Sequence, residues 1–250
     1  MISVLRTCVL LLPVVFLTSV DHAVVSRAFL RFPRLTLWAW QMPEQLDFID
    51  PQQVAVAYLD QTLYVSDRVI AEPRLQPMVV LPGTVVIAVV RIEMPAGASA
   101  ASNEIETQVV NAVLHSAWRA GIAALQVDFD AVQSQREFYR DVLVGVRAGM
   151  PKSMPLSITA LASWCAFDNW IAGLPVDEAV PMMFRMGREG RSVGSRRART
   201  PVREPLCRGS VGVATDEPWP EEIIGSRLYV FGVRPWTVQS VETVIAKAGQ

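Results

Sequence analysis

The sequence has little histidine and almost no net charge, and it lacks the common glycine-rich nucleotide motifs. Two histidines in the whole chain argue against a histidine-rich zinc or di-metal centre. A formal net charge of −1 gives no overall field that would attract nucleic acid or an anionic membrane. No P-loop or Rossmann fingerprint is present. We therefore expect no cofactor and no nucleic-acid partner, while an all-oxygen Mg²⁺ or Ca²⁺ site built from Asp128, Asp130 and Glu93 stays open.

Apolar runs of membrane-spanning length are also lacking, and the longest candidate is N-terminal. One basic residue, Arg6, precedes an apolar stretch over 7–20. This stretch is short for a membrane span and typical of a secretory signal. We predict that 1–23 is an export signal, cleaved or kept as a membrane anchor, and that the protein works in the periplasm or cell envelope. The alternative is a buried N-terminal helix.

The chain is rich in apolar residues. Hydrophobic residues make up 51% and charged residues 19%, which excludes a disordered chain and fits a large packed core. A length of 250 residues allows one large domain or two small ones. A basic run between Arg185 and Arg203 holds seven arginines, and we expect an irregular, solvated loop there.

Short apolar runs rich in β-branched residues recur along the chain, and each ends in polar or aromatic residues. Near-continuous apolar runs of this length predict strands buried on both faces, as in parallel sheets. There are eight of them, over 34–41, 54–60, 84–93, 124–130, 155–161, 179–187, 209–217 and 227–236.

Helical patterns follow in the later connections. The first, over 102–121, begins at a capping Ser102 or Asn103 and ends at Gly121. Others lie over 134–151, 168–175 and 237–249. Between the second and third strands, 61–83 instead alternates around Ser66 and Asp67, which predicts a β-hairpin.

This order of elements predicts an α/β fold. We expect one irregular (β/α)8 TIM-like barrel over 34–250, with a β-hairpin replacing the helix between strands 2 and 3. The alternative is an open doubly wound sheet, which fits less well because the first strand is not followed by a glycine-rich turn.

The predicted barrel also indicates whether the two cysteines outside the N-terminal segment can form a disulfide. Cys165 follows the fifth strand and Cys207 precedes the seventh, which assigns them to opposite rims. One strand separates the rims by roughly 17–20 Å, beyond disulfide reach. We therefore predict two free thiols.

In such barrels the chemistry gathers at the C-terminal ends of the strands. Here those ends carry acids, arginines and tryptophans, which suit a sugar ligand. Carboxylates move protons, guanidinium and amide groups bond hydroxyls, and indoles stack on sugar rings. The predicted substrate-binding residues are Trp40, Tyr58, Asp60, Arg91, Glu93, Gln126, Trp164, Arg185, Asp216 and Trp236.

Two carboxylates end the fourth strand. Asp128 and Asp130 are two residues apart, so in a strand they share a face at a spacing of about 7 Å, and Gln126 joins them. Like charges this close raise the pKa of one carboxyl, and glycoside cleavage needs one protonated and one ionised acid. We predict Asp128 and Asp130 as the catalytic pair. Asp60, Glu93, Asp216 and Glu217 stay open as the second carboxylate.

Two other interpretations remain. In the first, the barrel binds an envelope glycan without catalysis, through Trp40 or Trp236. Alternatively, Arg91, Arg185 and Arg234 neutralise the aspartates in a purely structural network, and the tryptophans pack in the core.

Long stretches of the chain resemble an uncharacterised bacterial family catalogued as domain of unknown function 3142. They include "LWAWQMPEQLDFI", "LQPMVVLPGTVVIAVVRIE", "LQVDFDA", "LSITALASWCAFDNWI", "DEAVPMMFRMG" and "REPLCRGSVGVATDEP". This resemblance brings no activity with it.

A more distant resemblance is to chitinase-like glycoside hydrolases of family 18, whose fourth strand ends in D-x-D-x-E. The matching positions here are Gln126, Asp128 and Asp130, and Trp236 is similar to the tryptophan on the floor of their site. Gln126 replaces an aspartate, and Asp130 replaces the catalytic glutamate with a side chain one methylene shorter. Because proton delivery depends on close placement, the resemblance implies a different glycosidase or a barrel that only binds glycans.

Overall fold

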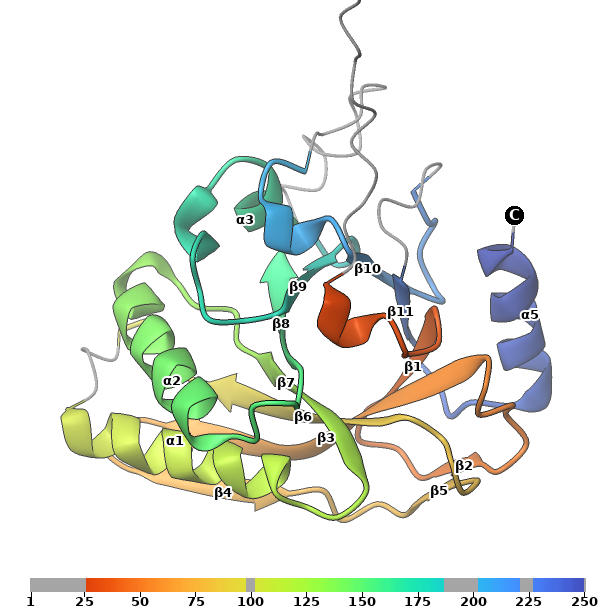
Figure 1. The fold of residues 1–250 in the computed structure, drawn as a ribbon, viewed down its shortest axis with the longest axis horizontal. Helices are drawn as coiled ribbons and strands as arrows, with labels where there is room; N and C mark the ends of the chain where they lie inside the picture. The colour runs from red at the N-terminus through yellow and green to blue at the C-terminus, as the bar shows by residue number, and fades with distance from the viewer. Residues whose placement is uncertain (1–25, 98–101, 187–201, 221–226, 250) are drawn as a thin grey trace, which may run out of the picture.

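Eight parallel strands close into a barrel in the computed structural model, which describes residues 26–97, 102–186, 202–220 and 227–249 (Figure 1). The ring closes because β1 pairs with both β3 and β11. The strands are β1 (Leu35–Ala39), β3 (Val54–Val65), β6 (Val86–Glu93), β7 (Ile122–Asp128), β8 (Leu156–Leu161), β9 (Glu178–Met182), β10 (Ser210–Ala214) and β11 (Arg227–Phe231). All eight lie on the predicted runs, and the predicted barrel is confirmed.

The predicted hairpin is also confirmed. β3 runs beyond the barrel and pairs antiparallel with β4 (Val69–Pro73), with Val65 opposite Val69. The chain then forms β5 (Met78–Val80), which pairs with β2 (Glu44–Leu46) in a small second sheet that the sequence patterns did not indicate.

Helices cover the outside of the barrel. α1 (Asn103–Ala117) and α2 (Arg136–Gly149) pack against each other, and α5 (Val238–Ala248) is the last described helix. The Ser102 side chain accepts a hydrogen bond from the backbone N–H of Ile105, as expected of an N-cap. Shorter helical segments are α3 (Ala162–Ala166), η1 (Arg27–Phe29), η2 (Gln133–Gln135), η3 (Asn169–Ile171) and η4 (Pro205–Cys207). The helix predicted over 168–175 is therefore only the single turn η3.

Two sets of apolar side chains explain the near-continuous apolar runs. An outer core lies between the strands and the helices and includes Val56, Val109 and Val142. An inner core fills the barrel and includes Trp38, Val89 and other residues contributed by its strands. Because strands of a closed barrel are covered on both faces, alternation of polar and apolar residues is lost.

The prediction of two free thiols is wrong. Cys165 and Cys207 form a disulfide, with their Cα atoms 5.8 Å apart. We had assigned the two residues to opposite rims from the strands they adjoin. Both instead lie outside the ring, in α3 and η4, and the backbone N–H of Arg203 donates to the Cys165 carbonyl at 2.9 Å. Segments that connect strands run over the outer surface, so residues next to opposite strand ends can meet there.

Two predictions concern residues outside the described ranges. They are the export signal over 1–23 and most of the arginine-rich loop, at 187–201. Within the described part of the chain, no helix combines the length and apolarity needed to cross a bilayer.

Candidate functional site

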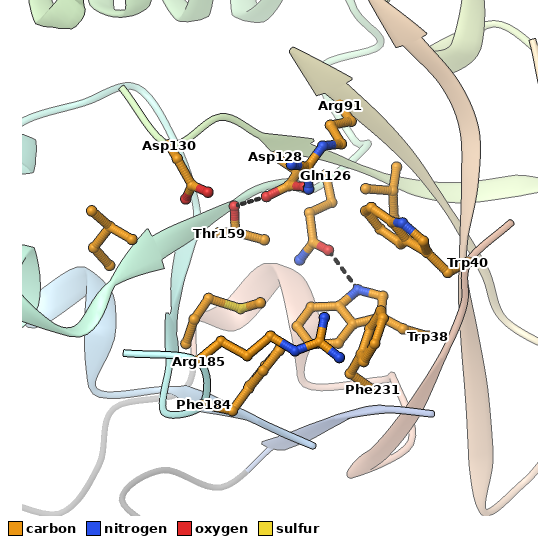
Figure 2. Close-up of a pocket in the computed structure, with 13 residues that line it drawn as sticks. Trp38, Trp40, Arg91, Gln126, Asp128, Asp130, Thr159, Phe184, Arg185 and Phe231 are labelled. Atoms are coloured by element: carbon orange, nitrogen blue, oxygen red, sulfur yellow. Dashed lines mark hydrogen bonds and ion pairs between the residues drawn. The ribbon is translucent and has the colours of Figure 1, made fainter. Parts of the chain in front are cut away.

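A cavity of about 260 Å³ opens at the C-terminal ends of the barrel strands. It brings together six of the twelve predicted site residues (Figure 2). They are Trp40, Arg91, Gln126, Asp128, Asp130 and Arg185. The volume is near the small end of ligand sites, which suits a single sugar ring better than a long stretch of polymer.

Asp128 is held in place through both carboxylate oxygens. Thr159, on the neighbouring strand β8, donates from its hydroxyl to Oδ1 at 2.6 Å. Arg91, on the strand at the other side, donates from its guanidinium to Oδ2 at 3.1 Å. Asp128 is buried, with 7% of its surface exposed. The ion pair and the hydrogen bond together fix one carboxylate at the end of β7.

Asp130 differs from Asp128 in having no hydrogen bond or ion pair with any part of the chain that the structure describes. It lies two residues beyond Asp128 and lines the same cavity. The cavity walls remove part of its hydration, which raises the pKa of the Asp130 carboxyl, and the negative charge of Asp128 raises it further. Arg91 acts in the opposite direction, and Glu93 adds a smaller upward effect.

Arg91 joins the carboxylates to an aromatic wall. Its Nε donates to Glu93, so Glu93 helps to orient Arg91 but is not among the residues that line the main cavity. The Arg91 guanidinium lies over the Trp40 ring, 5.7 Å from the centroid. Because two carboxylates already pair with Arg91, its charge is largely neutralised within the site.

Gln126 lies on the floor of the cavity beside Trp38. The Trp38 indole N–H donates to the Gln126 Oε1 at 2.9 Å, and Gln126 Nε2 donates to the Ser157 hydroxyl at 3.1 Å. Gln126 is fully buried, so these two bonds fix the orientation of its amide in the floor.

A buried polar chain continues below Gln126 toward the other end of the barrel. Ser157 and Tyr229 both donate hydroxyl hydrogens to Glu178 Oε1, at 3.3 and 2.9 Å. Arg227 pairs with Glu178 Oε2 at 3.4 Å, and each residue is only 2% exposed. Phe29 of η1 covers the Arg227 guanidinium, 4.3 Å from its ring centroid. The buried ion pair thereby anchors the hydrogen bonds that orient Gln126.

The remaining predicted residues lie outside the cavity, and placing Tyr58 and Asp60 in the cleft was wrong. The Tyr58 hydroxyl donates to Asp60, which also accepts from Ser116 on α1 and pairs with Arg119 at 2.8 Å. Both side chains therefore face the outer layer. The pKa of Tyr58 is raised, first by burial and then by the charge of Asp60.

The placements of Trp164, Trp236 and Asp216 also need correction. Trp164 belongs to α3 and packs edge-on against Trp170 in the outer core. Trp236 is buried in the outer core too, where its indole donates to the Trp38 carbonyl at 2.9 Å. Asp216 is exposed in the turn after β10 and does not line the cavity. The floor tryptophan is therefore Trp38 rather than Trp236.

Seven lining residues are absent from the predicted site. They are Trp38, Val89, Thr159, Leu161, Met182, Phe184 and Phe231. Trp38 lies two positions before Trp40, so strand alternation from Trp40 would have found it. Thr159 is in mid-strand, and Phe184 and Phe231 resemble ordinary core residues, so the sequence gives them no distinguishing signal.

The open metal hypothesis has no support in the described residues. They contain no group of three or more histidine, cysteine or acidic side chains arranged to hold a metal ion. Glu93 and Asp128 both form ion pairs with the Arg91 guanidinium. The positive charge beside these two carboxylates is therefore supplied by the protein.

Comparisons with known proteins give distant structural likenesses. No family model and no curated protein matches the chain, so its membership of the uncharacterised family stays a prediction. Among solved structures, the chain is similar to the spore cortex-lytic enzyme SleL of Bacillus cereus, with 16% identity and a TM-score of 0.42 over 63% of this chain and 43% of that one. It is also similar to the chitinase domain of the spore coat protein CotE of Clostridium difficile, with 14% identity and a TM-score of 0.38 over 64% of this chain and 53% of that one. The chain thus spans about half the length of these structures.

Proposed function

We propose that this protein is a carbohydrate-active barrel that cleaves a glycosidic bond, with Asp130 as the general acid and Asp128 as its carboxylate partner. The observation that carries the proposal is the different environment of these two carboxyls in one cavity. Asp128 is paired with Arg91, whereas Asp130 has no partner among the described residues and has a raised pKa. Glycoside hydrolysis needs one acid that holds a proton and one that stays charged.

The reaction follows from these two states. Asp130 gives its proton to the glycosidic oxygen, and the bond from that oxygen to the anomeric carbon breaks. The negative charge of Asp128 stabilises the positive charge that develops on the sugar ring. Water then adds to the anomeric carbon, and its proton returns to the carboxyl group of Asp130.

Sugar binding is supported by the other walls. Trp38, Trp40 and Phe231 provide apolar faces for the C–H side of a sugar ring. The carboxyl of Asp130, which has no partner among the described residues, provides a polar group for a hydroxyl. Apolar surface with a few fixed polar groups is the usual composition of a small-molecule site.

The test is hydrolysis of a panel of envelope oligosaccharides by the purified chain, with the reducing ends of the products counted. Asp130→Asn removes the acid and should lower the rate by on the order of 10²–10⁴-fold. Asp128→Asn should also abolish turnover. Asp216→Asn, at an exposed position of the same rim, is the matched control and should keep full activity. Equal turnover by wild type and Asp130→Asn would exclude the proposed role.

A glycan-binding barrel without catalysis is the second candidate. It is favoured by one observation, since both Asp128 oxygens are already bonded to Thr159 and Arg91. It predicts saturable sugar binding that depends on Trp40, with no product after long incubation.

We further infer that residues 34–250 form one domain and that the protein is exported. The Cys165–Cys207 disulfide supports export, because disulfides persist mainly in oxidising compartments.

A further inference from the structure

We propose that the cavity selects sugars that carry a carboxylate, and that Arg185 binds this carboxylate. The inference rests on the proposed function and names the substrate class of the same site. Three features of Arg185 support it: its backbone conformation, its unpaired guanidinium and its place in the cavity.

The backbone of Arg185 is in a conformation that non-glycine residues rarely adopt. Its φ is +52°, and within the described ranges no other non-glycine residue has a positive φ. The Glu217 carboxylate accepts the Arg185 backbone N–H, at 3.0 and 3.2 Å for its two oxygens. Such conformations gather at ligand sites, where the surroundings hold them in place. A glycine would fit this backbone more easily, so the arginine side chain itself is the feature that needs a reason.

The guanidinium of Arg185 has no acidic partner among the residues that the structure describes. It lies over Phe231, 5.0 Å from the ring centroid, and 6.0 Å from that of Phe184. It makes no ion pair with, and donates no hydrogen bond to, any residue that the structure describes. Arg91, the other guanidinium that lines the cavity, is paired with Glu93 and Asp128. Within the described part of the chain, the site thus has one neutralised guanidinium, Arg91, and one without an acidic partner, Arg185.

The two phenylalanines also orient the Arg185 guanidinium. Their rings are stacked on each other, with centroids 5.7 Å apart and planes 19° apart. Arginine that packs on aromatic rings keeps its N–H groups at the edge of its plane. Those donors form a planar fork that matches the two oxygens of a carboxylate.

Charge is distributed unevenly across the cavity. Figure 2 shows Asp128 and Asp130 along one side and Arg185 with Phe184 and Phe231 along another. A ligand carboxylate is repelled by the aspartates and attracted by Arg185. An acidic sugar therefore binds in one orientation, with its carboxylate at Arg185 and the rest of the ring toward the aspartates.

The test compares matched pairs of sugars that differ only in the carboxylate. Methyl glucuronide and methyl glucoside, then methyl galacturonide and methyl galactoside, are titrated into the full chain by calorimetry or ligand-observed NMR. In the wild type, one acid of these pairs should bind more tightly than its neutral match by on the order of tenfold, the value of a charge-assisted bidentate contact. Raising the salt concentration should reduce this preference.

Two variants assign the preference to Arg185. Arg185→Gln should bring the ratio of acidic to neutral affinity close to one, and Arg185→Lys should keep part of it. Arg234→Gln is the matched control, because Arg234 is exposed on the same rim but does not line the cavity. Circular dichroism and thermal melting check that each variant is folded.

Each outcome decides the inference separately from the proposed function. If neutral sugars bind as tightly as acidic ones, or if Arg185→Gln keeps the preference, the inference is wrong while glycoside cleavage stands. If no sugar of either kind binds, the inference is wrong, and the hydrolysis assay on the oligosaccharide panel decides the proposed function. If acids are preferred through Arg185 but no oligosaccharide is cleaved, the inference stands and the protein is a receptor for acidic glycans.

Discussion

Arg91 and Asp128 lie on adjacent strands and face each other, with the guanidinium 3.1 Å from the carboxylate. This pair holds the Asp128 carboxylate in place and leaves Asp130, two residues further along, beside it with no partner among the described residues. Two carboxyls that are neighbours in sequence thus have different surroundings, and the pKa of the Asp130 carboxyl is raised by burial and by the charge of Asp128. The predictions below test this difference and the scaffold that supports it.

The stability of the fold should depend on pH through Asp130. The pKa of Asp130 in the folded protein is raised above the ordinary value of 3.8. Its contribution to the free energy of unfolding is therefore fully present below pH 3.8 and is lost as pH rises through the folded pKa. Asp130→Asn has no ionisable group at this position, so it does not lose stability in this way. The variant should therefore gain thermal stability relative to wild type as pH rises from acidic to neutral. A difference in melting temperature that is constant over this range would contradict the assigned shift.

The disulfide should stabilise the barrel. It joins residues 42 positions apart, and loops of this size typically gain about 2–4 kcal/mol from a disulfide. A reductant should lower the urea midpoint of the wild type by a corresponding amount. The double variant Cys165→Ser with Cys207→Ser should have the lower midpoint already and show no response to reductant. Labelling of both Cys165 and Cys207 by a thiol reagent in the unfolded, unreduced wild type would show that the bond does not form.

The buried ion pair should be costly to break from one side. Glu178→Gln leaves Arg227 charged and 2% exposed, which should cost about 3–5 kcal/mol of unfolding free energy. The double variant with Arg227→Met removes both charges and should recover much of the loss. Urea titrations of the single and double variants measure both. If Glu178→Gln leaves the free energy of unfolding unchanged, the ion pair does not stabilise the barrel interior.

Two tryptophans should behave in opposite ways. Trp236 is 5% exposed in the outer core, so Trp236→Ala should cost about 3–5 kcal/mol and leave sugar affinity unchanged in the folded fraction. Trp40 lines the cavity and is less buried, so Trp40→Ala should cost less stability and weaken sugar binding. Sugar titrations and melting curves separate the two effects. If Trp236→Ala weakens sugar binding and Trp40→Ala does not, Trp236 contacts the sugar, as the resemblance to family 18 glycoside hydrolases implies.

Much of the fold was predictable because a strand that is buried on both faces requires a near-continuous run of apolar residues. The eight strands and the hairpin at Val65 and Val69 followed from such runs and from turn residues. The small sheet of β2 and β5 was missed because each strand has only three residues, too few for a periodic pattern.

The candidate site was predictable only in part, because an apolar run does not show which residues face inward. In "VAVAYLD", Ala57 belongs to the inner core and Tyr58 to the outer one, and the opposite assignment fits the letters equally well. Polar residues do not resolve this, because Gln126 and Asp128 line the cavity whereas Asp60 bonds Ser116 in the outer layer. The disulfide was missed for a different reason, since strand ends locate the rims but not the paths of the connecting segments over the outer surface.

The most direct test of the central claim is the pKa of Asp130, measured by NMR titration of ¹³C-labelled aspartate carboxyls in the wild type and in Asp128→Asn. The account predicts that Asp130 titrates above the ordinary aspartate value of 3.8, and that its pKa falls when the negative charge of Asp128 is removed. An Asp130 carboxyl that titrates at or below the ordinary value, with no response to Asp128→Asn, would contradict the division of roles and with it the proposed general acid.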